Sequence, residues 1–237
     1  MRSSPGGVHR IRRAGASLVL AAVLVLLTSN PAAAAGPGAY AIVPGTGTFT
    51  TLTTNNLAPQ GAGGGQVFYL STTGTGVNRL PFPLHLFNQF YTNVAIGSYG
   101  NVQPGVPVGE GKSDLPSGCL PTSTFGKPAI MALWGEVVYG GGSSGIFLRT
   151  QGVKPHRTFL ISWQGVFAVS APTTARAQAI FREDSQTITL VYGMTTRQTS
   201  VVVGIQSKQQ LTWAQRYCDG SGVYPTKGTK LTLNHSG

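Results

Sequence analysis

Few side chains in this sequence could act as a general base, and the first to consider are the histidines. Beyond the N-terminal segment they are His85, His156 and His235. A serine triad requires a base held between a nucleophile and an orienting acid. His85 lies in an apolar run that predicts a strand, His156 follows Lys154-Pro155 in a predicted turn, and His235 lies in the C-terminal tail. These settings carry no local signal of a triad, and we predict no catalytic histidine.

The acidic side chains are also few, and they follow the N-terminal segment: Glu110, Asp114, Glu136, Glu183, Asp184 and Asp219. Glycoside hydrolysis requires a pair of them across a substrate. Glu183 and Asp184 occupy a polar break between two strand patterns, where acids serve the turn. Glu136, two residues after Trp134, could lie in a sugar-binding groove, although a solvated strand end is the ordinary interpretation. No Asp-x-Asp-x-Asp run indicates calcium, and we assign no catalytic or metal-binding residue.

One segment is similar to the end of a phosphate-binding loop. It runs from Gly109 to Ser113 and reads Gly-Glu-Gly-Lys-Ser. The nucleotide-binding motif needs another glycine five residues before its Gly-Lys pair, so that backbone amides surround the phosphate. That position is Val106, and the following Asp114-Leu115-Pro116 does not begin a helix. We therefore interpret the segment as a loop between strands and predict no cofactor.

The chain has two cysteines, Cys119 and Cys218, separated by 99 residues (218 − 119). In an exported protein a disulfide persists, and we predict that these two cysteines are joined. The alternatives are a thiol nucleophile and a metal ligand, but no third ligand lies at zinc-finger spacing. In the chain-entropy model a bond closing such a long loop stabilises the fold by about 4–5 kcal/mol.

The N-terminus has the features of a secretory signal peptide over residues 1–35. Four arginines precede an apolar run of about 14 residues, Ala14 to Leu27, and small residues follow at Ala33 and Ala35. The run is shorter than the roughly 20 residues of a membrane-spanning helix, which favours cleavage after Ala35 over an uncleaved anchor. We therefore expect a secreted, extracellular protein with no transmembrane segment in the mature chain.

Removal of the signal peptide lowers the formal net charge. Of 17 basic residues four leave with it and no acidic residue does, so 13 − 6 gives +7 in place of +11. The remaining basic residues are scattered singly, which argues against a nucleic-acid partner. A basic field outside the cell favours anionic partners, and the expected partners are a cell-wall polymer, a glycan or a surface protein. The oligomeric state stays open.

The composition and patterning predict an all-β fold. The chain has 33 glycines, 15 prolines and only 10% charged residues, which is unusual for helical proteins. Residues 36–65 are rich in glycine and threonine and are interpreted as a linker or an irregular edge segment. Residues 66–237 are predicted to form an antiparallel β-sandwich, jelly-roll-like in character. The expected strands cover residues 67–70, 94–96, 146–149, 158–163, 177–181, 187–192, 200–205 and 230–233.

Two features refine this strand pattern. Phe159, Ile161 and Trp163 alternate with polar or smaller residues, which predicts one buried face for their strand. Residues 182–185 form a polar break that should join residues 177–181 and 187–192 as a hairpin.

Several segments, in order, resemble the nidogen-like extracellular domain and related secreted bacterial β-sandwich domains. They are residues 90–102, 129–134, 157–163, 177–192 and 200–205. The segment 129–134, Ala-Ile-Met-Ala-Leu-Trp, is similar to the family's Ile-Ala-x-Phe-Trp strand, and 157–163 resembles its Arg-x-Phe-Val-x-x-Trp strand. The chain departs from the family at Gly135-Glu136, where many relatives have an acidic residue directly after the tryptophan. The resemblance implies a non-catalytic extracellular module for adhesion or display.

Two functions from different classes follow as expectations. The first is a secreted, non-catalytic binding, adhesion or surface module of a bacterium, which would not be an enzyme. The alternative is a secreted carbohydrate-active hydrolase with a site on the face of the sandwich, and Glu136 would be its first candidate residue. A structural component of an assembled coat would differ from the first by associating with rising concentration.

Overall fold

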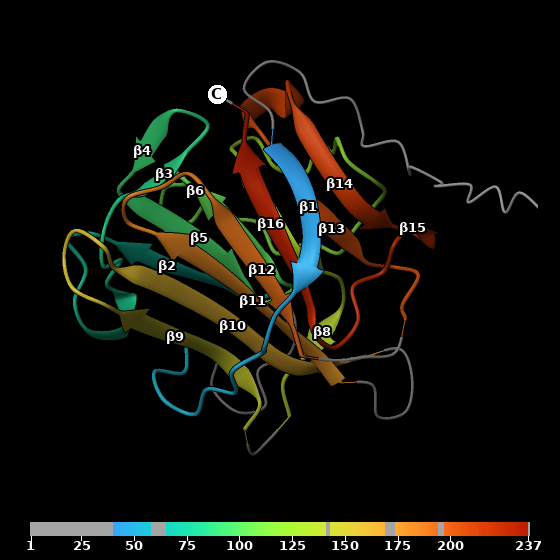
Figure 1. Ribbon diagram of the computed structural model, residues 1–237, viewed down its shortest axis with the longest axis horizontal. Helices are drawn as coiled ribbons and strands as arrows, with labels where there is room; N and C mark the ends of the chain where they lie inside the picture. The colour runs from blue at the N-terminus through green and yellow to red at the C-terminus, as the bar shows by residue number, and fades with distance from the viewer. Residues whose placement is uncertain (1–39, 58–64, 141–142, 169–173, 194–196, 237) are drawn as a thin grey trace, which may run out of the picture. The chain divides into compact units, whose positions relative to one another are not determined.

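The computed structural model describes residues 40–57, 65–140, 143–168, 174–193 and 197–236. These residues form two large antiparallel sheets packed face to face, with a separate two-stranded hairpin (Figure 1). The predicted all-β sandwich is therefore confirmed, while the predicted signal peptide of residues 1–35 lies outside the described residues. No helix in the described residues is long and apolar enough to span a membrane.

Seven strands form the first sheet. Their spatial order is β1 (Tyr40–Thr46), β16 (Thr229–His235), β12 (Ile188–Tyr192), β11 (Thr174–Arg182), β10 (Thr158–Phe167) and β8 (Val137–Val138), and β9 (Gly145–Gln151) pairs with another stretch of β10. The predicted hairpin is present, because β11 pairs antiparallel with β12 around the break at 182–185. Residues 40–46, placed by sequence in a linker or edge segment, form the edge strand β1, which pairs with β16 over its whole length.

The second sheet also has seven strands. Their order is β15 (Ser221–Gly222), β14 (Trp213–Cys218), β13 (Val202–Gln206), β7 (Ala129–Trp134), β6 (Asn101–Pro104), β5 (Asn93–Gly97) and β2 (Val67–Ser71). The hairpin consists of β3 (Leu84–Leu86) and β4 (Gln89–Tyr91), and two short 3-10 helices are η1 (Gly76–Asn78) and η2 (Lys208–Gln210). The paired strands of the sandwich thus begin at Tyr40, and the boundary drawn at residue 66 was too late.

The main core lies between the two sheets, where alternate residues of each strand meet. Phe159, Ile161 and Trp163 of β10 are all in this core, as their alternation predicted. Two hydrogen bonds cross from one sheet to the other. Trp163 Nε1 donates to Gly97 O at 3.0 Å, and the Tyr192 hydroxyl donates to Ala132 O at 2.7 Å. Polar ends of large aromatic side chains are thereby satisfied inside an otherwise apolar layer.

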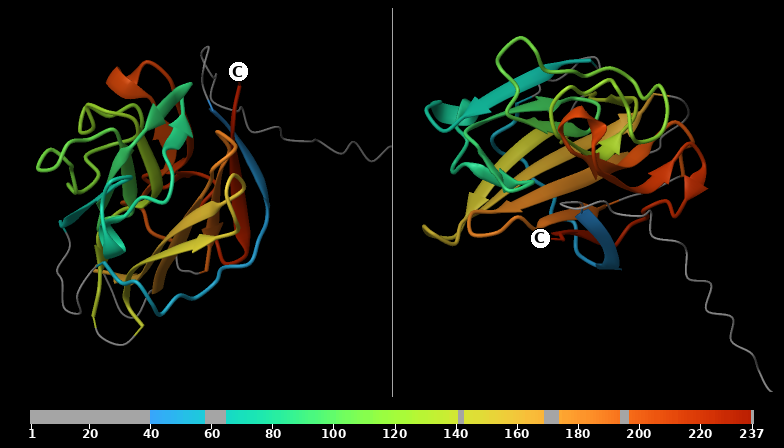
Figure 2. Two further views of the ribbon diagram at one scale, coloured as in Figure 1. Left: turned by 90° about the vertical axis from the view of Figure 1, so that its left-hand side faces the viewer. Right: turned by 90° about the horizontal axis from the view of Figure 1, so that it is seen from above.

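Parts of the outer faces of both sheets are buried as well, which the sequence analysis did not predict. Residues 47–57, the first strap, cross the outside of the first sheet, and residues 105–128, the second strap, cross the outside of the second sheet (Figure 2). Leu52 of the first strap packs on Phe147 and Leu160, while Leu120 and Phe125 of the second strap pack on the outer side of the second sheet. The straps explain why both faces of β10 are buried.

Four buried glutamines fasten the straps to the sheets, and each binds both the N–H and the C=O of one strap residue. The pairs are Gln164 with Leu52, Gln178 with Thr50, Gln103 with Lys112, and Gln206 with Thr122. Their donor–acceptor distances run from 2.5 to 3.3 Å. A side-chain amide presents one donor and one acceptor, so it pairs with a backbone residue as a neighbouring strand would.

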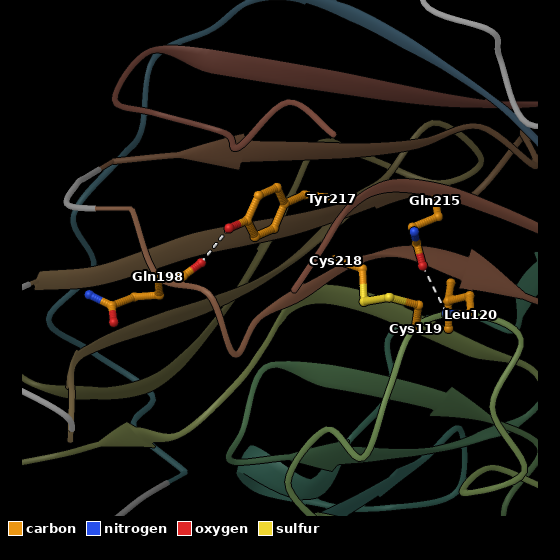
Figure 3. Close-up of a disulfide and its surroundings, with 6 residues drawn as sticks. All are labelled: Cys119, Leu120, Gln198, Gln215, Tyr217 and Cys218. Atoms are coloured by element: carbon orange, nitrogen blue, oxygen red, sulfur yellow. Dashed lines mark hydrogen bonds between the residues drawn. A yellow bond between two sulfur atoms is a disulfide. The ribbon is translucent and has the colours of Figure 1, made fainter. Parts of the chain in front are cut away.

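The predicted disulfide between Cys119 and Cys218 is present and joins the second strap to the end of β14. Beside it, the N–H of Leu120 donates to Gln215 Oε1 at 2.8 Å (Figure 3). One covalent bond and one hydrogen bond therefore fix the middle of the strap to a single strand.

The first prediction concerns these glutamines. Gln206→Leu removes both hydrogen bonds to Thr122 and leaves a buried N–H and C=O without partners, so the free energy of unfolding should fall by about 2–4 kcal/mol. Urea denaturation followed by fluorescence measures it. Gln151→Leu, on the exposed end of β9, is the control and should change stability by less than about 0.5 kcal/mol. Equal stabilities for the two variants would contradict the role assigned to Gln206.

The second prediction concerns the disulfide. Replacing Cys119 and Cys218 together by serine frees a closed loop with a sequence separation of 99, so the free energy of unfolding should fall by about 2–5 kcal/mol. Urea denaturation is again the measurement, with the chemically reduced wild-type protein as the comparison. If the serine variant were as stable as the oxidised protein, the bond would not hold the strap.

Candidate functional site

The structure separates the three histidines into two places. His85 on β3 stacks on the Phe90 ring of β4, with ring centroids 4.1 Å apart. Burial and the nearby charge of His235 lower the pKa of His85. His156 instead lies before β10, where its Nδ1 is 2.7 Å from Asp184 Oδ2. The structure therefore brings His85 and His235 near each other and pairs His156 with an acid.

Residues 141–145 spell Gly-x-Ser-x-Gly, a pattern that the sequence analysis missed. In hydrolases this pattern turns a strand into a helix, which exposes the serine. Here Ser143 lies in a turn and the chain continues directly into β9. The local geometry is that of a turn before a strand, so the pattern does not form a nucleophile elbow.

The adjacent acids Glu183 and Asp184 each form an ion pair across neighbouring loops. Glu183 accepts two hydrogen bonds from the Arg157 guanidinium, at 2.6 and 2.8 Å, and these lower the pKa of the Glu183 carboxyl. The hydrogen bond from His156 lowers the pKa of Asp184 in the same way. Both carboxylates join the turn between β11 and β12 to the turn before β10, as their position in a hairpin break suggested.

The segment similar to a phosphate-binding loop uses its backbone amides within the protein. The N–H of Glu110 donates to Pro107 O, that of Gly111 to the Tyr69 hydroxyl, and that of Lys112 to Gln103 Oε1. A phosphate loop needs such N–H groups free to surround its ligand. The segment therefore belongs to the second strap and serves to fix it to β2 and β6.

A groove beside the disulfide has the strongest features of a binding site. It consists of two adjoining hollows of about 220 and 200 Å³ that share Pro116, Ser200 and Val201. We call it the disulfide groove. Its other described lining residues are Leu115, Ser117, Gly118, Glu136, Phe167, Gln198, Val202, Cys218 and Asp219.

Side-chain and backbone contacts hold the walls of the groove together. The Tyr217 hydroxyl donates to Gln198 O at 2.7 Å (Figure 3), and Arg197 donates to the Tyr217 hydroxyl and to Gly220 O. The N–H of Asp219 donates to Val201 O. Because the disulfide also ties the second strap to β14, segments far apart in sequence form one preorganised groove.

The groove is acidic although the protein is basic. Its described lining residues include two carboxylates, those of Glu136 and Asp219, and no lysine or arginine. Glu136 is half-buried and Asp219 is exposed. Burial, together with the negative charge of Glu136, raises the pKa of the Tyr99 hydroxyl. Glu136 thus lies near Tyr99, and its negative charge opposes ionisation of the Tyr99 hydroxyl.

The lining combines groups that suit a polar ligand with an apolar side. The two carboxylates accept hydrogen bonds, the Ser117 and Ser200 hydroxyls and the Gln198 amide donate and accept them, and Leu115 and Pro116 provide apolar contact. Convergent polar groups on a partly apolar concave surface are the usual composition of ligand sites. Among the described residues, no group of three or more histidines, cysteines or acids could hold a metal ion.

Sequence reasoning identified Glu136 of this groove as a candidate site residue and Cys218 as a disulfide partner, and it missed the rest. Glu136 was recognised because an acid near a tryptophan suggested a sugar-binding groove, although the tryptophan itself, Trp134, lies buried under the second strap. Asp219 was missed. It directly follows Cys218, so the predicted disulfide could have drawn attention to it. Gln198 and Pro116 carry no such signal, because only the folded strap brings them together.

Comparison with known proteins adds one finding. A family model described as NIDO related matches residues 39–232, which is most of the chain and nearly the span of the paired strands. No curated protein and no solved structure matches the chain.

The third prediction follows from the electrostatics of the groove. Glu136→Gln removes the negative charge near Tyr99, so the pKa of Tyr99 should fall, while remaining above 10.0 because burial persists. A pH titration of the tyrosine ring carbons by NMR measures this value. Asp184→Asn, on the hairpin between β11 and β12, is the control and should leave it unchanged. An unchanged Tyr99 pKa in Glu136→Gln would place Glu136 away from Tyr99 in solution.

Proposed function

Because the chain belongs to the nidogen-related family of extracellular modules, we propose that it is a secreted, non-catalytic binding module at a bacterial surface and that the disulfide groove holds its ligand. The ligand class that suits this groove is a hydroxyl-rich glycan. The observation that carries the proposal is the acidic, preorganised groove in a basic domain.

The location of the groove supports this assignment. The two straps cover much of the outer faces of the sheets, and their glutamine contacts leave less open sheet surface for a ligand. Another hollow, of about 450 Å³, has Gln103 and Lys112 among its lining residues, and these two pair with each other to hold the second strap. A ligand there would compete with that contact, whereas the disulfide groove presents side chains that the fold leaves available.

The chemistry of the groove supports a glycan in particular. Sugar hydroxyls donate to carboxylates, and the carboxylates of Glu136 and Asp219 offer four acceptor oxygens in adjoining hollows. Hydrogen bonds to charged acceptors contribute more than neutral ones, about 1.5–3 kcal/mol each. The apolar side formed by Leu115 and Pro116 suits the C–H face of a sugar ring.

A second candidate function has one specific observation in its favour. The presence of two carboxylates in one groove is also the minimum requirement of a glycoside hydrolase, in which one acts as acid and the other as base or nucleophile. We favour binding, because Asp219 is exposed to solvent, whereas the acid of a glycoside hydrolase works from a pocket that shields it from water.

The fourth prediction tests the proposal by direct binding. The full mature domain, screened on an array of neutral and amino-sugar glycans, should bind at least one structure without cleaving it. Glu136→Gln and Asp219→Asn should each raise the dissociation constant about tenfold or more, because each removes a charged hydrogen-bond acceptor. Calorimetry measures the constants, and circular dichroism confirms that the variants fold.

The control and the contrary outcomes are as follows. Asp184→Asn removes a carboxylate of the β11–β12 hairpin, which is not among the lining residues of the disulfide groove. This variant should bind as the wild type does. Equal affinities of all three variants would remove the ligand from the disulfide groove. Turnover of a bound glycan that disappears in Glu136→Gln would replace the binding function by the hydrolase.

A further inference from the structure

A second, smaller hollow of the sandwich has the opposite charge. It has a volume of about 120 Å³. Its lining includes Asn55 of the first strap, Arg79 directly after η1, and Arg149 and Thr150 of β9. We call it the arginine hollow. Its described lining comes from β9, β10, the first strap and the segment after β2, whereas that of the disulfide groove includes Cys218 of β14 and the following Asp219. In Figure 1, β2 and β9 lie away from β14 and β15.

Its two arginines have no acidic partner. Within the described part of the chain, the salt bridges involve only Arg157 and His156 among the basic side chains. Arg157 shows how this protein neutralises a guanidinium, with two hydrogen bonds to Glu183 and a position over the Phe82 ring. Arg79 and Arg149 are both exposed and line one hollow whose described lining contains no carboxylate.

The neighbour that does meet Arg149 is neutral. When the Gln151 amide is turned so that its oxygen faces the guanidinium, that oxygen accepts from Arg149 at 2.5 Å. A neutral amide orients a guanidinium but leaves its charge uncompensated. Two like charges that line one small hollow repel each other, and an anion bound between them would offset that repulsion.

The walls that carry these arginines are fixed. On one side, Asn55 pairs with β9, because its C=O accepts from the Leu148 N–H at 3.1 Å and its side chain donates to Leu148 O at 3.4 Å. On the other side, the Arg79 N–H donates to Gly76 O, and the next residue, buried Leu80, donates to Ser71 O at 2.8 Å. The two guanidiniums therefore extend from backbone that is already positioned.

We propose that Arg79 and Arg149 form a binding site for an anionic group, which is a carboxylate, a sulfate or a phosphate carried by an extracellular ligand. Guanidinium groups bind all three through paired N–H donors, and the Thr150 hydroxyl and Asn55 amide lie in the same hollow to complete the contact. The formal charge of +7 after signal removal would draw such ligands toward the domain. The site is separate from the disulfide groove and does not depend on the function proposed for it.

The fifth prediction tests this site with three probes at matched ionic strength: sodium sulfate, inorganic phosphate and trigalacturonic acid. Backbone NMR titration of the mature domain should show shifts concentrated in η1, β9 and residue 55 for at least one probe. Arg79→Gln and Arg149→Gln should each weaken that binding about tenfold. Arg149→Lys, which keeps the charge but loses the paired donors, should weaken it by a smaller factor.

The control separates a site from general charge attraction. Lys227→Gln removes one positive charge from the exposed loop before β16. The affinity of this variant for the bound probe should stay within about twofold of the wild-type value. The best probe identifies whether the anionic group is a sulfate, a phosphate or a carboxylate. The proposal is overturned if no probe binds or if Lys227→Gln weakens binding as much as the arginine variants do. Binding of neutral glycans in the disulfide groove would be unaffected by either result.

Discussion

The structure depends on one repeated interaction, a buried glutamine that pairs with the backbone of a strap. Gln164 and Gln178 do this on the first sheet, and Gln103 and Gln206 do it on the second. Burying an amide without partners costs free energy, but each of these amides both donates to and accepts from a single strap residue, so neither it nor that residue is left unsatisfied. The glutamines let an irregular segment lie on a sheet without forming a strand. Apolar strap residues such as Leu52 and Phe125 can then be buried on the outer faces.

This arrangement leaves less of the sheet faces open to a ligand. A sandwich with an open outer face could bind a ligand across its strands, but here straps cover part of each outer face. The two hollows proposed as binding sites are lined by different strands, and their charges are opposite: Glu136 and Asp219 line one, and Arg79 and Arg149 line the other. In a domain with so few acidic residues, the presence of two in one groove is what singles that groove out. The arginine hollow is singled out in the same way, because Arg79 and Arg149 line it and its described lining contains no carboxylate.

The sequence predicted the strands well where polar and apolar residues alternate strongly. It predicted them poorly where a strap, and not the opposite sheet, buries part of the strand. The β10 pattern placed Phe159, Ile161 and Trp163 in the core, and the break at 182–185 located a hairpin. β14 was missed because its pattern is mixed: its pairing with β13 contains a register shift, and its polar residue Gln215 binds the second strap. β1 was hidden in a segment rich in glycine and threonine.

Glutamine–strap pairing cannot be read from sequence, because a glutamine in a strand looks solvent-exposed until a distant segment covers it. The first segment that carried the resemblance begins at residue 90, whereas the family match begins at residue 39, since β1 lacks distinctive residues.

The straps connect the stability of the fold to both proposed sites. Residues 115–118 of the second strap form one wall of the disulfide groove, and Asn55 of the first strap forms part of the arginine hollow. The contacts that hold the straps in place are the glutamine pairs, the disulfide and the bonds between Asn55 and Leu148. A strap that detached would expose apolar surface and remove a wall from a binding site in the same event. Selection for a tightly held strap and selection for a preorganised site would therefore act on the same buried amides, which accounts for polar side chains in positions where a sandwich of this kind would otherwise place apolar ones.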